Sequence, residues 1–283
     1  MVARILMKCS WQLPEMKYKY MKFYRIKALI IRQLYLYPRS FPRLMDVFFW
    51  PVLELLVWGF LSVYLEKLNL NSVNIASILL GALIFWELLN RSQNAVTIAF
   101  LEDVWEKNLL NIFVTPVKLV EFVTSTVFLG LVRIITQGVI LGFIAWLLYQ
   151  FNVFQFGLYT IPFIISLLLF GWILGIFVVA IILRYGTTAQ VLAFGIIFLV
   201  QPFSAVFYPV SALPTVLQYV AYILPSTYVF EGMRTIIATG TLPLMPMVIS
   251  FALNVVYLVL VMWFFYAMFR VVKKKGLLLK LDQ

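Results

Sequence analysis

The chain has 283 residues, of which 64% are hydrophobic and 12% are charged, and its net charge is +11. A soluble globular protein is excluded, because it would need far more polar surface. The chain has no histidine and only one cysteine, Cys9, so the commonest general base and an intrachain disulfide are also excluded. We therefore expect an all-α polytopic membrane protein.

The N-terminal region is basic and contains one predicted helix. Residues 22–37 have apolar side chains at helical spacing, with Arg25 and Arg32 on the opposite face. Pro38 would end this helix before the membrane is reached. The pattern predicts an interfacial helix, whereas a disordered basic leader is the better interpretation of residues 1–20.

Six segments are long and apolar enough to span a membrane. About 20 apolar residues cross the hydrocarbon core as a helix. The hydrophobicity of these segments is continuous rather than alternating, which favours helices over the strands of a barrel. The predicted spans are 45–64, 76–97, 120–149, 159–183, 189–207 and 244–269.

Lys and Arg are distributed unevenly around these spans. Ten precede the first span and five follow the last, whereas the outer connections hold only Lys67 and Arg234. The positive-inside rule places both termini in the cytoplasm, and we expect no nucleic-acid partner because this rule and the lipid bilayer account for the charge. The predicted divisions are a basic cytoplasmic leader and interfacial helix at 1–43, a six-span membrane domain at 44–270 and a basic cytoplasmic tail at 271–283.

Four charged residues lie inside the predicted spans: Glu54, Glu87, Arg91 and Arg133. Ionisable groups at this depth are costly, so they usually pair or face a water-filled cavity. Arg91 follows Glu87 by four residues, which puts both on one helix face. Mutual neutralisation and a polar translocation path both remain open.

The connection between spans two and three concentrates acidic residues in EDVWEKNLLNIFVTP, residues 102–116. The pattern predicts a short amphipathic helix whose N-terminal acids favour the helix dipole and which stops at Thr115-Pro116. A connector resting on headgroups is one interpretation. Its acidity instead favours a cytoplasmic projection that docks into a basic groove on another protein.

The outer connection 208–243 is too apolar for a solvated loop, and four prolines divide it. The pieces are too short to span, so we expect re-entrant or interfacial helices covered by protein or lining a water-filled cavity. Simple packing of the outer ends of spans five and six and an external gate are both open.

Several enzyme motifs are absent from the sequence. No GxxxxGK[ST] loop, GxSxG elbow or histidine- or cysteine-based zinc site occurs. We therefore expect this chain to bind no ATP through such a loop, to hold no metal and to lack a catalytic site.

Two stretches resemble the permease subunits of ATP-binding-cassette exporters of the type-2 family. LEDVWEKNLLNIFVTPVK, residues 101–118, is similar to the coupling segment of that family. FYPVSALPTVLQYVAYILPSTYVFEGMR, residues 207–234, is similar to its signature after span five, with Tyr208 as a departure. The resemblance covers roughly residues 22–270. It implies six spans, an N-terminal interfacial helix, a cytoplasmic coupling helix and a re-entrant helical hairpin between spans five and six.

The resemblance also implies two sets of site residues. The coupling helix would contact a separate ATPase through Glu102, Asp103, Trp105, Glu106 and Leu110. The external gate would consist of Phe207, Pro209, Leu213, Pro214, Pro225, Tyr228, Glu231 and Arg234.

The implied function is that of a transport subunit rather than an enzyme, in the cell membrane. Two copies of the permease, or one with a close paralogue, would form the path, and two ABC ATPase subunits would bind ATP and magnesium, leaving this chain without a cofactor. The cargo would be an exported amphipathic or lipid-linked compound, such as a polysaccharide, a lipid-linked glycan or a hydrophobic drug. The main alternative is an ion-coupled secondary transporter using Glu54 and Glu87; a membrane-embedded transferase and a purely structural protein are further alternatives.

Overall fold

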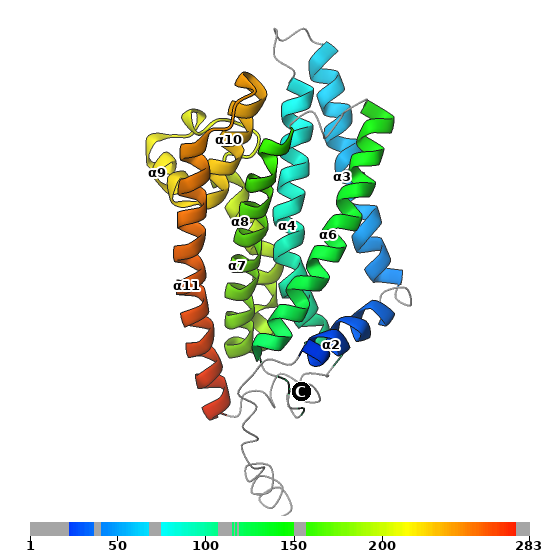
Figure 1. The fold of residues 1–283 in the computed structure, drawn as a ribbon, viewed down its shortest axis with the longest axis vertical. Helices are drawn as coiled ribbons and strands as arrows, with labels where there is room; N and C mark the ends of the chain where they lie inside the picture. Colours follow the sequence, from blue (N-terminus) through cyan, green and yellow to red (C-terminus); the bar gives the residue numbers. More distant parts are fainter. Residues whose placement is uncertain are drawn as a thin grey trace, which may run out of the picture.

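The structure, a computed structural model, describes residues 23–36, 41–67, 75–106, 115, 117, 119–149 and 157–275. All regular elements within these residues are helical, which agrees with the all-α prediction (Figure 1). The longer helices are α2 Phe23–Leu36, α3 Phe41–Lys67, α4 Ile75–Trp105, α6 Leu119–Tyr149, α7 Ile161–Tyr185, α8 Val191–Phe203, α10 Pro225–Thr239 and α11 Leu244–Lys275. The short elements are η3 Leu158–Thr160, η4 Gly186–Gln190, η5 Val210–Ala212 and α9 Thr215–Ile223.

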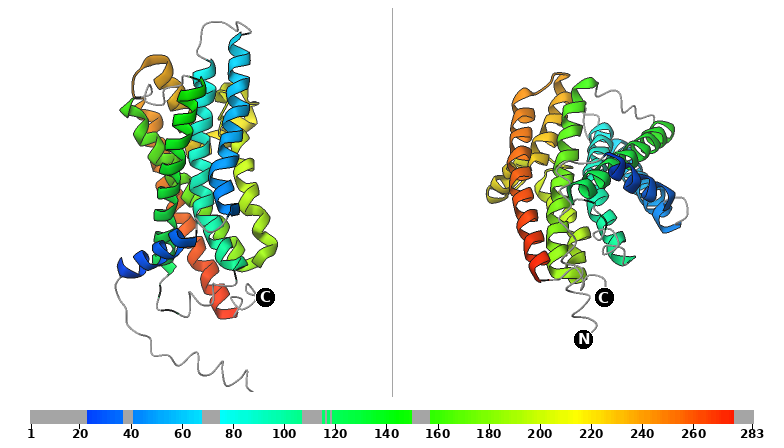
Figure 2. Two further views of the ribbon diagram at one scale, coloured as in Figure 1. Left: turned by 90° about the vertical axis from the view of Figure 1, so that its right-hand side faces the viewer. Right: turned by 60° about the horizontal axis from the view of Figure 1, so that its bottom comes forward.

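The helices form an elongated bundle. Helix α4 lies at its centre and packs against α3, α6, α7 and α8, while α11 packs against α7 and α10. Helix α2 lies across one end of the bundle, and α9 and α10 lie at the other end (Figures 1 and 2). The two predicted site regions are therefore at opposite ends of the molecule.

Each predicted span overlaps one helix: α3, α4, α6, α7, α8 or α11. Within the residues that the structure describes, three stretches are long and apolar enough to cross a membrane by length and hydropathy alone: Val120–Tyr149, Leu158–Tyr185 and Leu244–Val272. Shorter apolar stretches occur at Phe48–Tyr64 and Thr188–Phe203. Helix α4 contains Glu87 and Arg91, which reduce its apolar character.

The fifth predicted span, 189–207, is longer than the helix found there. Helix α8 ends at Phe203, and the chain then turns through Ala205, whose φ of 52° lies in the left-handed region. Helix α8 is about 20 Å long, and η4 in front of it adds about 10 Å. Hydropathy alone missed the turn, because the residues within it are as apolar as those of the helix.

Two glycines allow α7 to approach α4 closely. A Cβ atom at Gly171 would lie 2.6 Å from the Cβ of Ser92 and 2.8 Å from the carbonyl oxygen of Leu89. A Cβ atom at Gly175 would lie 2.9 Å from the carbonyl oxygen of Gln93. This spacing of small residues is typical of closely packed membrane helices, where it lets backbones meet.

The predicted interfacial helix at 22–37 corresponds to α2, Phe23–Leu36. Its apolar side chains Phe23, Leu34 and Tyr35 are exposed, as a membrane-facing surface requires. Its two arginines, however, do not face the outside. Arg25 is buried and Arg32 is partly buried, because both contact acidic side chains of the bundle.

Candidate functional site

The stretch expected to begin a separate coupling helix is the last turn of α4. The backbone N–H of Glu106 donates to the carbonyl oxygen of Glu102 over 2.9 Å, and α4 ends at Trp105. The structure thus corrects the expected boundary: Glu102 and Asp103 lie at a helix C-terminus, where the dipole disfavours negative charge. Residues 107–114, including Leu110, lie outside the described residues.

Arg32 of α2 compensates for this unfavourable position. It forms an ion pair with Asp103, whose side chain is 1% exposed, whereas that of Arg32 is 29% exposed. Burying an aspartate at the negative end of a helix would otherwise be costly. The pair therefore holds the end of α4 against α2.

A second buried ion pair connects α2 to α6. Nη1 of Arg25 lies 3.5 Å from Oε2 of Glu121, and the two side chains are 5% and 0% exposed. Glu121 is in the first turn of α6, where a negative charge is favoured by the dipole. Arg25 and Arg32 are seven residues apart and share one face of α2. We call these two ion pairs the α2 bridge. Through them, α2 connects the end of α4, which precedes residues 106–118, to the start of α6, which follows them.

The remaining described coupling residues are accessible at the surface. The Trp105 side chain is 50% exposed, and its indole N–H donates to Oε1 of Gln190 in η4 over 3.1 Å. Glu106 is also exposed. Glu102, at 8% exposure, and Asp103 are buried. The predicted contact set is therefore divided into buried residues that join α4 to the bundle and exposed residues available to another protein.

The structure brings together three of the four charges that were predicted to lie inside the spans. Nε of Arg91 lies 3.1 Å from Oε2 of Glu87, and the Glu54 carboxyl group of α3 lies close to that of Glu87. Two asparagines extend this cluster along α4: Asn90 donates to Glu87 over 3.4 Å, and Asn94 donates to Asn90 over 3.0 Å. Sequence reasoning missed the asparagines, although their spacing from Glu87, three and seven residues, places them on one face.

Arg133 is the fourth charge and lies on α6, one turn before Gln137. Gln137 and Gly138 of α6 line a small cavity together with Glu87 and Arg91 of α4. The cavity has room for about one water molecule. Glu87 and Arg91 of α4 therefore face Gln137 and Gly138 of α6 across this cavity, and Arg133 lies one helical turn away from it.

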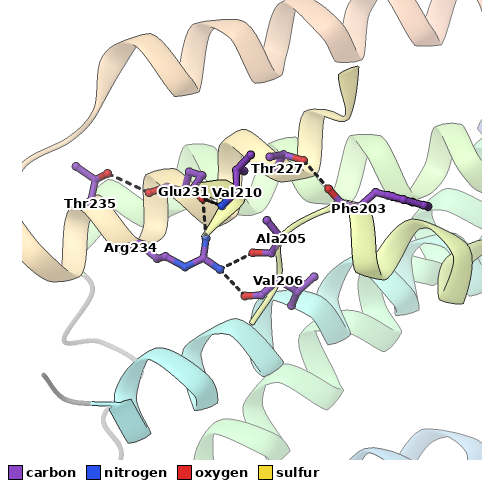
Figure 3. A network of polar contacts seen from close by, with 8 residues as sticks. All are labelled: Phe203, Ala205, Val206, Val210, Thr227, Glu231, Arg234 and Thr235. Atoms are coloured by element: carbon purple, nitrogen blue, oxygen red, sulfur yellow. Dashed lines mark hydrogen bonds and ion pairs between the residues drawn. The ribbon is translucent and has the colours of Figure 1, made fainter. Parts of the chain in front are cut away.

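At the end of the bundle opposite α2, Arg234 of α10 holds the turn that follows α8 (Figure 3). Its Nη2 donates to the carbonyl oxygens of Ala205 and Val206, the latter over 2.8 Å. Its Nη1 lies 3.2 Å from Oε1 of Glu231, which also accepts the backbone N–H of Val210 over 2.8 Å. Burial lowers the pKa of the Arg234 guanidinium, and the Glu231 carboxylate opposes this shift. This network fixes the left-handed turn at Ala205.

Aromatic and hydroxyl groups add to this outer turn. The Phe207 ring stacks on Trp58 of α3 with centroids 4.3 Å apart, and the Tyr228 hydroxyl donates to the carbonyl oxygen of Tyr222 over 3.0 Å. Ser204 and Ser226 share a hydrogen bond of 2.7 Å. Four other predicted gate residues lie where helical elements begin or end: Pro209 precedes η5, Leu213 and Pro214 precede α9, and Pro225 begins α10.

Replacing Arg234 by alanine should destabilise the protein. The carbonyl oxygens of Ala205 and Val206 and the Glu231 carboxylate would lose a shared charged donor, for a loss of about 2–3 kcal/mol. We expect a lower thermal unfolding midpoint in detergent, partly recovered in Arg234→Lys. Thr239→Ala, at the exposed end of the same helix, is the matched control. An unchanged midpoint for Arg234→Ala would show that the network does not hold the turn.

Long helices with exposed apolar surfaces define the chain as a multi-pass helical membrane protein. The family model of the ABC-2 type transporter matches residues 24–238, which is most of the chain. The chain belongs to the ABC-2 type transporter family, and it is an ABC transporter permease, a transport subunit rather than an enzyme. Family membership implies association with an ABC ATPase. No curated protein matches the chain.

Proposed function

We propose that this chain is the permease subunit of an ATP-driven exporter of amphipathic or lipid-linked compounds. In this proposal α3, α4, α6, α7, α8 and α11 are the six spans, and both termini are in the cytoplasm of a cell-membrane protein. Two permeases, identical or closely paralogous, form the path. Two ATPase subunits bind ATP and magnesium, and the permease itself uses no cofactor.

The α2 bridge is the observation that supports this mechanism best. Its ion pairs attach one helix to the end of α4 and to the start of α6. Residues 106–118 connect those two ends and contain the segment similar to family coupling helices. A force applied to this segment would therefore move α2, α4 and α6 together rather than bend one connection. Such a coupled element is what a change between two transporter states requires.

We propose that the ATPase contact uses the exposed residues Trp105 and Glu106, together with the segment that contains Leu110. An exposed indole beside a carboxylate suits a partner groove with an apolar floor and a basic rim. The buried acids Glu102 and Asp103 serve this contact indirectly, by fixing the end of α4.

The ATPase contact is tested by co-purification with the cognate ABC ATPase. Trp105→Ala combined with Glu106→Lys should lower ATPase recovery about tenfold, as expected for loss of an aromatic hot spot and its charge. Trp146→Ala on α6 is the matched control, because the two tryptophans are 50% and 52% exposed. Equal recovery of ATPase with the double variant and with wild type would refute the contact.

We propose that the outer turn and the α9–α10 hairpin form the external gate. The Arg234 network gives this region a fixed geometry in the present state, and the Trp58–Phe207 stack joins it to α3. Movement of α3 would therefore reach the outer turn. In its role as a gate, this region would move during export and change the contacts described above.

An ion-coupled secondary transporter is the second candidate, because Glu54 and Glu87 meet between α3 and α4. Inverted vesicles distinguish the two functions, with a lipid-linked oligosaccharide and an amphipathic dye as separate cargoes. We expect cargo accumulation that requires ATP and persists after ionophores collapse the ion gradients. Accumulation that follows the gradient without ATP would favour the secondary transporter.

A further inference from the structure

A side-chain hydrogen bond joins the end of α4 to the connection between α7 and α8. The indole N–H of Trp105, the last residue of α4, donates to Oε1 of Gln190 over 3.1 Å. Half of the Trp105 side chain is exposed, so packing alone does not fix the direction in which its ring faces. The hydrogen bond to Gln190 supplies that constraint, because its geometry is directional.

Gln190 is directly continuous with α8. It is the last residue of η4, and α8 begins at the next residue, Val191. Helix α7 ends at Tyr185, and Gly186, with a φ of 75°, begins η4 at once. No residue between α7 and α8 lies outside a helical element. A displacement of Gln190 would therefore pass to the first turn of α8 without being absorbed by a loop.

Helix α8 packs along one face. Its buried side chains are Ala193, Ile197 and Val200, which recur at helical spacing. The large apolar side chains on the rest of its surface are exposed: Val191, Leu192, Phe194, Phe198 and Leu199. Along this face, Nε2 of Gln93 in α4 donates to the carbonyl oxygen of Ala193 over 3.1 Å. A helix held on one face can slide by a small amount against its neighbours, which is a common form of movement between packed helices.

The other end of α8 is bonded to α10. The Thr227 hydroxyl donates to the carbonyl oxygen of Phe203 over 3.4 Å, and the Ser204 and Ser226 hydroxyls lie 2.7 Å apart (Figure 3 shows the Thr227 bond). Arg234 of α10 binds the turn that follows. Helix α8 therefore has a hydrogen-bonded partner at each end: Trp105 of α4 at one, and α10 at the other.

We propose that Gln190 is a positioning residue for the ATPase contact and that α8 transmits movement of this contact to the outer turn. A partner that binds Trp105 would displace Gln190, then α8, and then the start of α10. A contiguous series of hydrogen bonds and one rigid helix is a physical route for such coupling. This inference rests on the proposed ATPase contact and external gate. It adds a route that is separate from the one through α3 and the Trp58–Phe207 stack.

The test uses the full-length permease assembled with its cognate ATPase in lipid nanodiscs. Val216→Cys on α9, at a position that is 74% exposed, carries an environment-sensitive fluorophore. The background is Cys9→Ser, because Cys9 is the only cysteine of the chain. We expect ATP to change the emission of this label in the otherwise wild-type complex, because the α9–α10 hairpin moves.

Gln190→Leu removes the acceptor at similar side-chain volume. It should shift the ATP-dependent equilibrium reported by the label back toward the ATP-free state about two- to tenfold, the factor that corresponds to one hydrogen bond. Trp105→Phe keeps a ring but removes the donor, so adding Gln190→Leu to it should have no further effect. Gln190→Glu retains an acceptor and should retain the response. Thr188→Leu, at an exposed position of η4, is the matched control and should respond as wild type.

Recovery of the ATPase and the unfolding midpoint of the permease should stay at wild-type values in Gln190→Leu. A fall in either value together with the lost response would mean that Gln190 only supports the fold, and this would overturn the inference. So would a full response in Gln190→Leu, or an ATP-insensitive label in a complex that transports its cargo. Co-purification with the Trp105 and Glu106 double variant tests the proposed contact without the label, so its failure is distinguishable from failure of this inference.

Discussion

Gly171→Leu should prevent the permease from accumulating in a folded form. The first side-chain atom would already lie 2.6 Å from the Cβ of Ser92 and 2.8 Å from the carbonyl oxygen of Leu89. The backbone oxygen cannot move without displacing α4. Ser92 also donates to the carbonyl oxygen of Leu168 over 2.7 Å, so separation of α4 from α7 breaks a partly buried hydrogen bond. We expect a loss of at least about 3 kcal/mol, the upper part of the range for overpacking.

The measurement is the amount of monodisperse protein in size-exclusion chromatography and its thermal unfolding midpoint. Gly195→Leu on α8 is the matched control, because a Cβ atom there meets nothing within 4 Å. That variant should behave as wild type. Recovery of Gly171→Leu at the wild-type level would mean that α4 and α7 are farther apart than the structure places them.

Arg32→Asp should produce the second large effect. It breaks the ion pair with Asp103, whose side chain is 1% exposed, and places two negative charges together at the C-terminus of α4. Breaking a buried ion pair in this way typically costs about 3–5 kcal/mol. We expect a lower unfolding midpoint of the permease and loss of ATP-dependent transport by the assembled complex.

The exchanged pair, Arg32→Asp with Asp103→Arg, provides the direct test of this explanation. A double-mutant cycle should show favourable coupling, with stability and transport partly restored. Lys27→Glu reverses a charge on the exposed face of the same helix and should have little effect. Equal losses in the single and exchanged variants would show that Asp103 does not depend on Arg32.

Continuous hydrophobicity predicted the long helices, because the membrane and the bundle interior select the same apolar side chains, and α2 was predicted by hydrophobic periodicity. It identified α2 within one residue at each end. It did not identify the partners of Arg25 and Arg32, because Glu121 and Asp103 lie 96 and 71 residues away along the chain. Tertiary pairing of this kind leaves no periodic signal.

The site residues were predictable to different degrees. Glu54, Glu87 and Arg91 could be identified as candidate site residues from the sequence, because charged residues are rare within apolar segments. The proximity of Glu54 and Glu87 depends on how α3 packs against α4, which one sequence does not reveal. The extension of α4 through Trp105 was missed because acidic residues are expected at a helix N-terminus. The ion pair with Arg32 instead stabilises Asp103 at the C-terminus of α4.

The polar side chains of α4 also bear on how the chain enters the membrane during synthesis. Each charged residue at the centre of a single inserting helix costs about 2.5–3.5 kcal/mol. Glu87, Asn90, Arg91 and Asn94 make hydrogen bonds to one another within α4 itself. In the six-span arrangement these bonds form as soon as the helix does, before any neighbour arrives, so α4 reaches the translocon with much of its polar cost already offset. Among the described residues, Glu54 interacts with Glu87 and Arg91 of α4 rather than with its own helix, so α3 should leave the translocon together with α4, as a helical hairpin.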